Sequence, residues 1–353
     1  MYKLAKFFLL LCIFSFFLAG CTTEDSNTVE KKYSEINVMI SRDNFADVFS
    51  MKDKQLYKID SVTNLSDAVY SYVDGVYIYL INDTLGQNFY KNKMKIETKN
   101  DVKLVNNFYN ASDIKISPKG EKIAYRSFSK DSYESAEGLT VYNIKKNKNV
   151  KFKSSVLVSG SLYNWLNKDE IVYYGVSTKD KEYNKLYKYN FDTDSEDVYI
   201  DNIKDFCTFF TLVKNKGVLS LEENVAETRL VFSEMESKER TLITNSISNI
   251  YYAFYNEKSN AVYFIGLEKN EEKCALFKVA INDLTLTRLT YDFPKEVDRN
   301  GGLIGDSSGN VYFCGINNSS SSNNQVYMLN MKDQSINLII GQKARYYLGG
   351  NNK

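Results

Sequence analysis

The stretch ISPKGEKIAYRSF, residues 116–128, decides the fold. It has the pattern of a β-hairpin: a short strand, a Pro118-Lys119-Gly120 turn, and a second strand of apolar and aromatic residues. One hairpin says little about a fold, but a hairpin that returns at a fixed spacing indicates a repeat architecture. The second strand opens at Ile123, which therefore serves as the anchor for a comparison along the chain.

Equivalent strands recur at a nearly constant interval. Their first apolar residues are Tyr77, Ile123, Ile171, Val218, Val262 and Val311, so successive anchors are 46, 48, 47, 44 and 49 residues apart. Two residues after the anchor stands a large ring in five units (Tyr79, Tyr125, Tyr173, Phe264 and Phe313). Four residues after it stands a small residue in four units (Ser127, Gly175, Gly266 and Gly315). These two positions share one face of a strand, so the units present similar surfaces to their neighbours.

A third and a fourth strand follow the hairpin in five of the units, for example LTVYNI (139–144) and VKFKS (150–154). Four antiparallel strands in each repeat of this length predict an all-β fold, a β-propeller of four-stranded antiparallel blades. We expect six blades between about residues 62 and 345, with seven as the alternative. We also expect VMISRD (38–43) or QLYKID (55–60) to add one strand to the last blade and close the ring.

The stretch SPKGEKIAYRS followed by LTVYNI resembles the TolB-like and dipeptidyl-peptidase-type propeller repeat. In that repeat a Ser-Pro-Asp-Gly-Lys turn leads into an Ile-Ala-Tyr or Ile-Tyr-Phe strand; Lys119 stands here in place of the Asp. KQLYKID (54–60) and VDGVYIYL (73–80) also look like the short repeats of lipoprotein propellers from Gram-positive bacteria. The resemblance implies an architecture and no particular activity.

The amino terminus has the pattern of a secretory signal. MYKLAK supplies two lysines, and residues 7–20 form an apolar run of 14 residues, short of the roughly 20 that a membrane-spanning helix needs. Leu18-Ala19-Gly20-Cys21 resembles the lipobox of bacterial lipoproteins, which implies cleavage before Cys21 and a diacylglycerol on its sulfur. We therefore expect a signal peptide (1–20), a flexible tether (21–35) and one propeller domain (36–353) held at the outer face of the cytoplasmic membrane.

Composition argues against several classes of activity. With 45 basic and 44 acidic residues, the chain lacks the basic field that binds nucleic acid. It contains no histidine and no G-x-S-x-G, so a serine-peptidase triad is not expected, nor is a cofactor or a metal. DTDSED (192–197) resembles a calcium loop, but Asp197 replaces the required Gly, so a solvated turn is the better interpretation. Cys207, Cys274 and Cys314 are expected to be buried apolar residues.

We expect a non-catalytic, lipid-anchored module that binds an envelope protein or a peptide. Asp67, Asp113, Tyr163 and Tyr252 are expected on the loops that enter the innermost strands, where they would line the mouth of the central channel, a place where propellers often bind ligands. The alternative is a carboxylate-based glycan-active enzyme or a carbohydrate-binding propeller. Two carboxylates about 5 to 9.5 Å apart in the channel mouth would favour that alternative.

Overall fold

The computed structural model describes residues 33–84, 90–179, 185–317 and 323–349. The hairpin around Pro118 forms as predicted: β8 (Asn110–Ile116) pairs antiparallel with β9 (Lys122–Phe128), with Ile116 opposite Ile123. The Ser117 amide donates to the Lys122 carbonyl at 2.8 Å, and the Gly120 amide donates to the Ser117 carbonyl at 2.9 Å. Lys119 and Gly120 both have positive φ (73° and 59°), so the turn needs a glycine at its second left-handed position.

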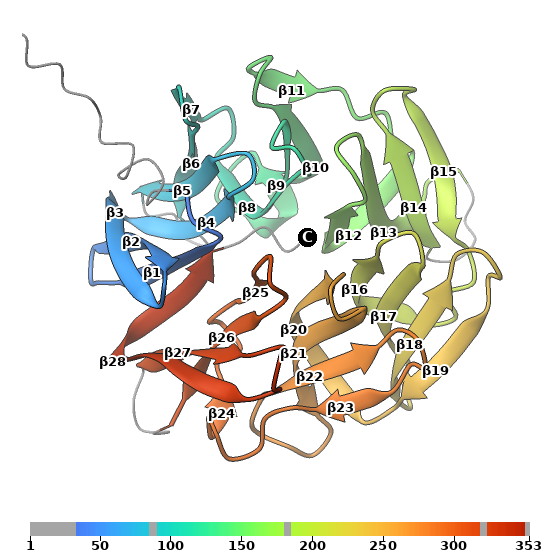
Figure 1. Ribbon diagram of the computed structural model, residues 1–353. Coiled ribbons are helices and arrows are strands. Elements are labelled where there is room, and N and C mark those ends of the chain that lie inside the picture. Colours follow the sequence, from blue (N-terminus) through green and yellow to red (C-terminus); the bar gives the residue numbers. More distant parts are fainter. Residues whose placement is uncertain (1–32, 85–89, 180–184, 318–322, 350–353) are drawn as a thin grey trace, which may run out of the picture.

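Five of the sheets have four antiparallel strands each, arranged as blades around a central axis (Figure 1). Their strands follow one another in the chain, from the innermost to the outermost strand of each blade. The blades are β4 (Leu65–Ser71), β5 (Val76–Thr84), β6 (Lys91–Glu97) and β7 (Val102–Val105); β8, β9, β10 (Ala136–Asn143) and β11 (Lys148–Val150); β12 (Val156–Trp165), β13 (Glu170–Ser177), β14 (Lys185–Asn190) and β15 (Ser195–Ile200); β16 (Phe206–Val213), β17 (Gly217–Glu223), β18 (Thr228–Glu234) and β19 (Arg240–Thr244); and β20 (Ile247–Asn256), β21 (Ala261–Glu268), β22 (Ala275–Ala280) and β23 (Leu286–Arg288).

The sixth sheet has eight strands and joins the two ends of the described chain. It comprises β24 (Glu296–Val297), β25 (Leu303–Gly305), β26 (Val311–Ile316), β27 (Asn324–Leu329), β28 (Ile336–Gly349), β1 (Ile36–Ser41), β2 (Phe45–Lys52) and β3 (Gln55–Thr63). The first part of β28 pairs with β27, and its last five residues pair with β1, where Arg345 lies opposite Ser41 and Gly349 opposite Asn37. Figure 1 shows β28 (red) beside β1 (blue) at this closure.

The amino-terminal segment contributes more than the sequence predicted. VMISRD and QLYKID were expected to supply one closing strand, but they belong to β1 and β3, and β2 lies between them. The prediction was wrong because the innermost strand of this group comes from the other end of the chain, so no complete unit is visible in the sequence. The number of blades stays a prediction: the described chain has six sheets, but counted as four-strand groups, with β28 shared, it has seven, which is the alternative that the sequence left open.

The core lies between neighbouring four-strand groups. Among the described residues it divides into seven apolar clusters, each of which joins two consecutive groups. The five predicted rings, Tyr79, Tyr125, Tyr173, Phe264 and Phe313, are all buried. The small residues that follow them have a steric reason. A Cβ on Gly175 would lie 2.2 Å from the Leu157 carbonyl oxygen, on the neighbouring innermost strand.

The ring has two faces that differ in their connections. We call loop face the side on which the second strand of each group turns into the third, for example at residues 129–135, 224–227 and 269–274. We call turn face the side with the tight hairpin turns, for example at 117–121, 214–216 and 257–260. Tyr33–Glu35, at the start of the described chain, lie at the turn face, because Glu35 accepts a hydrogen bond at 2.9 Å from the amide of Ser307, in the β25–β26 turn.

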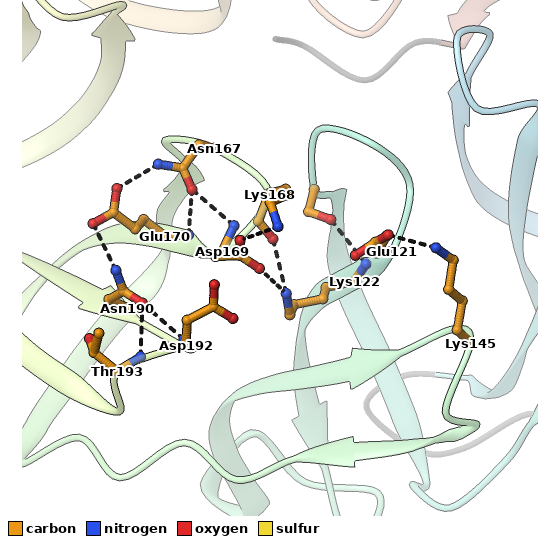
Figure 2. A network of polar contacts seen from close by, with 11 residues as sticks. Glu121, Lys122, Lys145, Asn167, Lys168, Asp169, Glu170, Asn190, Asp192 and Thr193 are labelled. Atoms are coloured by element: carbon orange, nitrogen blue, oxygen red, sulfur yellow. Dashed lines mark hydrogen bonds and ion pairs between the residues drawn. The ribbon is translucent and has the colours of Figure 1, made fainter.

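Two neighbouring blades are linked at the turn face by a network of charged groups (Figure 2). Lys122 Nζ, on β9, donates to Asp169 Oδ1 at 2.6 Å and to the Lys168 carbonyl at 3.1 Å, both in the β12–β13 turn. The side chains of Lys122 and Asp169 are only 9% and 12% exposed. Burial alone would raise the pKa of Asp169, but Lys122 and Lys168 outweigh it and lower that pKa to about 2.

We predict that Asp169→Asn lowers the free energy of unfolding at pH 7 by about 2 to 4 kcal/mol, because Lys122 stays buried without its counter-ion. Since the folded-state pKa is depressed, the wild-type contribution of about 2 kcal/mol is complete above pH 4 and is lost as the pH falls toward 2. Urea unfolding of both proteins from pH 7 to pH 2.5 measures this. Lys145→Ala is the control: Lys145 pairs with Glu121 in the same network but is 75% exposed, so we expect a loss below about 1 kcal/mol. Equal losses for the two variants would contradict the assignment.

Candidate functional site: the central channel

The innermost strands enclose a cavity of about 710 Å³ along the axis of the ring. Its lining comes from every four-strand group, including β1, β2 and the end of β28. Polar and charged side chains in this lining are Ser41, Ser66, Asp67, Asp113, Lys115, Ser161, Asn164, Thr208, Thr211, Arg299 and Asn300, and aromatic ones are Trp165, Phe209, Phe210, Tyr251, Tyr252 and Tyr347. A cavity of this size, lined by polar and apolar side chains together, can hold a small ligand or a side chain of a partner.

Most innermost strands carry a bulge where they line the channel. In β4, β16 and β20 the extra residue is Ser66, Thr208 and Ser248. Each hydroxyl donates to a carbonyl of the second strand, to Leu80 at 3.1 Å, Leu221 at 3.2 Å and Leu267 at 3.0 Å. A bulge turns the following side chain to a new direction, so these hydroxyl residues set which side chains face the channel.

Two insertions bring further polar groups into the channel. Between Val158 and Tyr163 the β12 strand leaves its register with β13, and residues 298–302 separate β24 from β25. The second insertion places Arg299 and Asn300 in the lining, where the Arg299 guanidinium lies 5.8 Å from the centre of the Tyr251 ring. The channel is therefore lined by both strands and loops.

Asp113 is held in a fixed orientation on β8. Its backbone is left-handed, with a φ of 57°. Its Oδ2 accepts a hydrogen bond from Ser112 Oγ at 2.7 Å and forms an ion pair with the Arg126 guanidinium at 3.0 Å. Its carbonyl accepts the Tyr163 hydroxyl at 2.6 Å. The carboxylate thus has a cationic partner within the protein.

Lys115 also has its bonds made by the protein. Its Nζ donates to the Tyr163 carbonyl at 2.6 Å and to Asn164 Oδ1 at 2.7 Å, and it lies 5.2 Å from the centre of the Tyr163 ring. Burial lowers the pKa of Lys115 to about 8, and the charge of Asp113 opposes that shift. Lys115 therefore acts as a fixed link between β8 and β12.

Asp67 differs from these groups. Its Oδ1 accepts the amide of Ala68 at 2.8 Å, and no basic side chain of the described chain forms an ion pair with it. The Asp67 side chain is exposed to the channel, but the surrounding strands exclude bulk water and raise its pKa to about 6; the Ala68 hydrogen bond opposes this shift and the charge of Asp113 adds to it. Burial likewise raises the pKa of Tyr252 to about 12, and the charge of Asp67 contributes. Asp67 is thus a channel carboxylate without a counter-ion.

The structure places three of the four predicted channel residues in the lining: Asp67, Asp113 and Tyr252. Tyr163 is fully buried beside the lining and supports Asp113 and Lys115. Whether these residues bind a ligand stays a prediction, and Cys21 lies outside the described residues. The sequence analysis missed Lys115, Arg299 and Trp165, because bulges and insertions, not strand periodicity, determine that they line the cavity.

A second cavity of about 290 Å³ shares Tyr251, Arg299 and Asn300 with the channel and adds Glu272, Glu296 and Asp298. Among the described residues, no group of three or more His, Cys, Asp or Glu is arranged to hold a metal ion. Residues 192–194 form the turn between β14 and β15, as the sequence predicted for the calcium-like motif. Cys207, Cys274 and Cys314 are buried free thiols. None of the helices in the described part of the chain could cross a membrane.

The sequence matches no known family model and no curated protein. Solved structures do match. The β-propeller domain of the trilobed protease from Pyrococcus furiosus has a TM-score of 0.52 at 16% identity, over 79% of this chain and 85% of that chain. A prolyl endopeptidase has a TM-score of 0.59 at 11% identity, over 93% of this chain and 53% of that chain. Dipeptidyl peptidase 4 from Porphyromonas gingivalis has a TM-score of 0.54 at 11% identity, over 88% of this chain and 52% of that chain.

These likenesses, all below 25% identity, show the fold alone. The protein is a β-propeller, as the hairpin repeat predicted, and it shares this fold with the propeller domains of these peptidases. This chain spans about half the length of the two peptidases just described, so their activities do not carry over with the fold.

We predict that Asp67 titrates near pH 6 and that Asp113→Asn lowers its pKa, because a neighbouring negative charge is removed. Carbon NMR of the side-chain carboxyls measures both values. Far-UV circular dichroism checks that Arg126, which loses its partner in this variant, leaves the fold intact. An Asp67 titration near pH 4 in the wild-type protein would contradict this description of the channel.

Proposed function

We propose that this protein is a non-catalytic binding propeller, anchored by lipid on Cys21, that holds a segment of an envelope protein or a peptide at its channel mouth. The observation that carries the proposal is the axial cavity of about 710 Å³ with a carboxylate, Asp67, that has no counter-ion among the described residues. The absence of histidine and of a nucleophile motif from the sequence supports a binding role over catalysis.

The position of the chain start supports this arrangement. Tyr33–Glu35 lie at the turn face, and residues 22–32 between Cys21 and Tyr33 span at most ~40 Å. A lipid on Cys21 would therefore hold the turn face nearer to the membrane and leave the loop face directed outward. Two acyl chains make such attachment durable.

The anchor is tested by replacing its attachment point. We predict that Cys21→Ser moves the protein from the membrane fraction to the soluble or secreted fraction, because no acyl chain can be attached to serine by the same route. Ultracentrifugation followed by detergent phase partition of the membrane fraction measures this. If the released variant still entered the detergent phase as the wild-type protein does, lipid on Cys21 would not be the anchor.

The binding role is tested by capture of partners from solubilised envelope. We predict that partners are recovered with the wild-type chain and lost when residues 129–135, on the loop face, are replaced by a Gly-Ser segment of equal length. The matched control replaces 235–239 on the turn face and should retain the partners. Identical partners with both replaced chains would reject the loop face as the binding surface.

One observation keeps a second candidate, a carboxylate-based glycan-active enzyme or carbohydrate-binding propeller. Asp67 and Asp113 both line the channel; one has a raised pKa and the other pairs with Arg126, which is an arrangement that acid catalysis can use. Release of reducing sugar from cell-wall glycans by the wild-type chain, and its loss in Asp67→Asn, would favour this candidate.

A further inference from the structure

Exposed apolar side chains are concentrated on the loop face. Among the described residues, 17 large hydrophobic side chains are exposed; 9 lie at the loop-face ends of strands or in loop-face connections, and 4 (Tyr72, Val73, Val102 and Met235) lie at the turn face. The loop-face residues are Phe45, Tyr90, Tyr133, Leu157, Val176, Phe206, Val225, Tyr291 and Phe293. Since exposed apolar surface of this kind marks interaction sites, the loop face is the better candidate for a partner.

Three of these residues form a continuous apolar strip, defined by Leu157, Val176 and Phe206. Leu157 lies directly opposite Val176 in the β12–β13 pair, so both side chains project from the same side of the sheet. Phe206 packs against Tyr174 with ring centres 5.8 Å apart, and Tyr174 precedes Val176 by two residues on that side. The strip thus crosses from the β12–β15 blade to the β16–β19 blade.

The apolar strip ends at the channel wall. Thr208, which lines the channel, follows Phe206 by two residues on β16, a separation of about 7 Å along a strand. Across the channel, Asp67 lies two residues from the loop-face end of β4. A ligand segment on the strip can therefore extend a side chain into the channel from the loop face.

The charge in the channel selects the kind of side chain. Asp113 pairs with Arg126, Lys115 bonds to Tyr163 and Asn164, and Arg299 lies over Tyr251. Asp67 has only the Ala68 amide among the described residues. Asp67 is exposed to the channel, so an incoming cation can reach its carboxylate, and Tyr252 in the same lining offers an aromatic ring to that cation.

We propose that the occupant of the channel mouth is a peptide segment in which a lysine or arginine stands next to apolar residues. This inference rests on the proposed binding function. The basic side chain enters the channel toward Asp67, its methylene stem packs against the aromatic lining, and the adjacent apolar residues cover Leu157, Val176 and Phe206. Asp67 favours a basic segment, whereas Arg299, which has a ring contact with Tyr251 but no ion pair among the described residues, would favour an acidic one, so the two kinds of peptide are compared directly.

Isothermal titration calorimetry allows a direct test, because it needs no reporter group at the mouth; Trp165, the only tryptophan in the sequence, stands at the turn-face end of β12. The full chain in detergent micelles is titrated with Ac-Leu-Lys-Leu-NH2 and Ac-Leu-Glu-Leu-NH2 while the heat of binding is measured. We predict a saturable change with the lysine peptide and an affinity at least about tenfold lower for the glutamate peptide. Asp67→Asn should weaken the lysine peptide by about tenfold or more, as expected for the loss of a charge-assisted contact.

The apolar strip is tested separately. Val176→Ser should weaken Ac-Leu-Lys-Leu-NH2 by about three- to tenfold and leave Ac-Gly-Lys-Gly-NH2 unchanged. Val198→Ser is the matched control, because Val198 is similarly exposed (49% against 42% for Val176) but lies on the outer strand β15, and it should change neither affinity.

The inference is overturned if the lysine peptide gives no response at millimolar concentration, if both peptides bind equally, or if Asp67→Asn leaves the affinity unchanged. Its failure can be told apart from that of the proposed function. Partners that are lost when 129–135 is replaced but retained by Asp67→Asn would keep the binding propeller and reject the basic segment. No captured partner and no peptide response would reject both.

Discussion

The pairing of β28 with β1 is the contact on which the ring depends. Residues 345–349 and 37–41 stand at opposite ends of the described chain, and their ladder joins the two halves of one eight-stranded sheet. Bringing such distant segments together costs chain entropy, which the two clusters flanking this junction offset by burying side chains such as Val38, Val48 and Leu348. Without this ladder β28 would leave an open sheet edge, and β1 another.

The repeat was predictable because it depends on residues that are close together in the sequence. Turn residues such as Gly120, a large ring such as Tyr125 and a small residue such as Gly175 each satisfy a constraint that recurs in most of the units: a left-handed turn, a buried interface, or a close backbone. The group at the closure was not predictable in this way. Its innermost strand lies about 300 residues from the other three, so no window of sequence contains the whole unit.

The channel was predictable only in part, for a physical reason. Asp67 and Asp113 could be placed near the axis because the repeat assigns them to the innermost part of their units. The direction of a side chain there depends on bulges, which break the alternation on which strand prediction rests. Tyr163 illustrates the effect: it was expected in the mouth, and it lies buried after the β12 insertion, where its hydroxyl and carbonyl hold Asp113 and Lys115. Lys115, Arg299 and Trp165 reach the lining by the same kind of irregularity.

The hydroxyl-bearing bulges make the register of the sheet independent of which side chain faces the channel, although these two properties are usually coupled. Ser66, Thr208 and Ser248 close the local gap with the second strand, so the ladder on either side keeps its register whatever residue follows. Substitutions at the next position, where Asp67 and Phe209 stand, therefore alter the chemistry of the axis while the packing between blades is preserved. Such a scaffold can diversify its ligands by single exchanges, and relatives with the same ring can hold unrelated molecules along it.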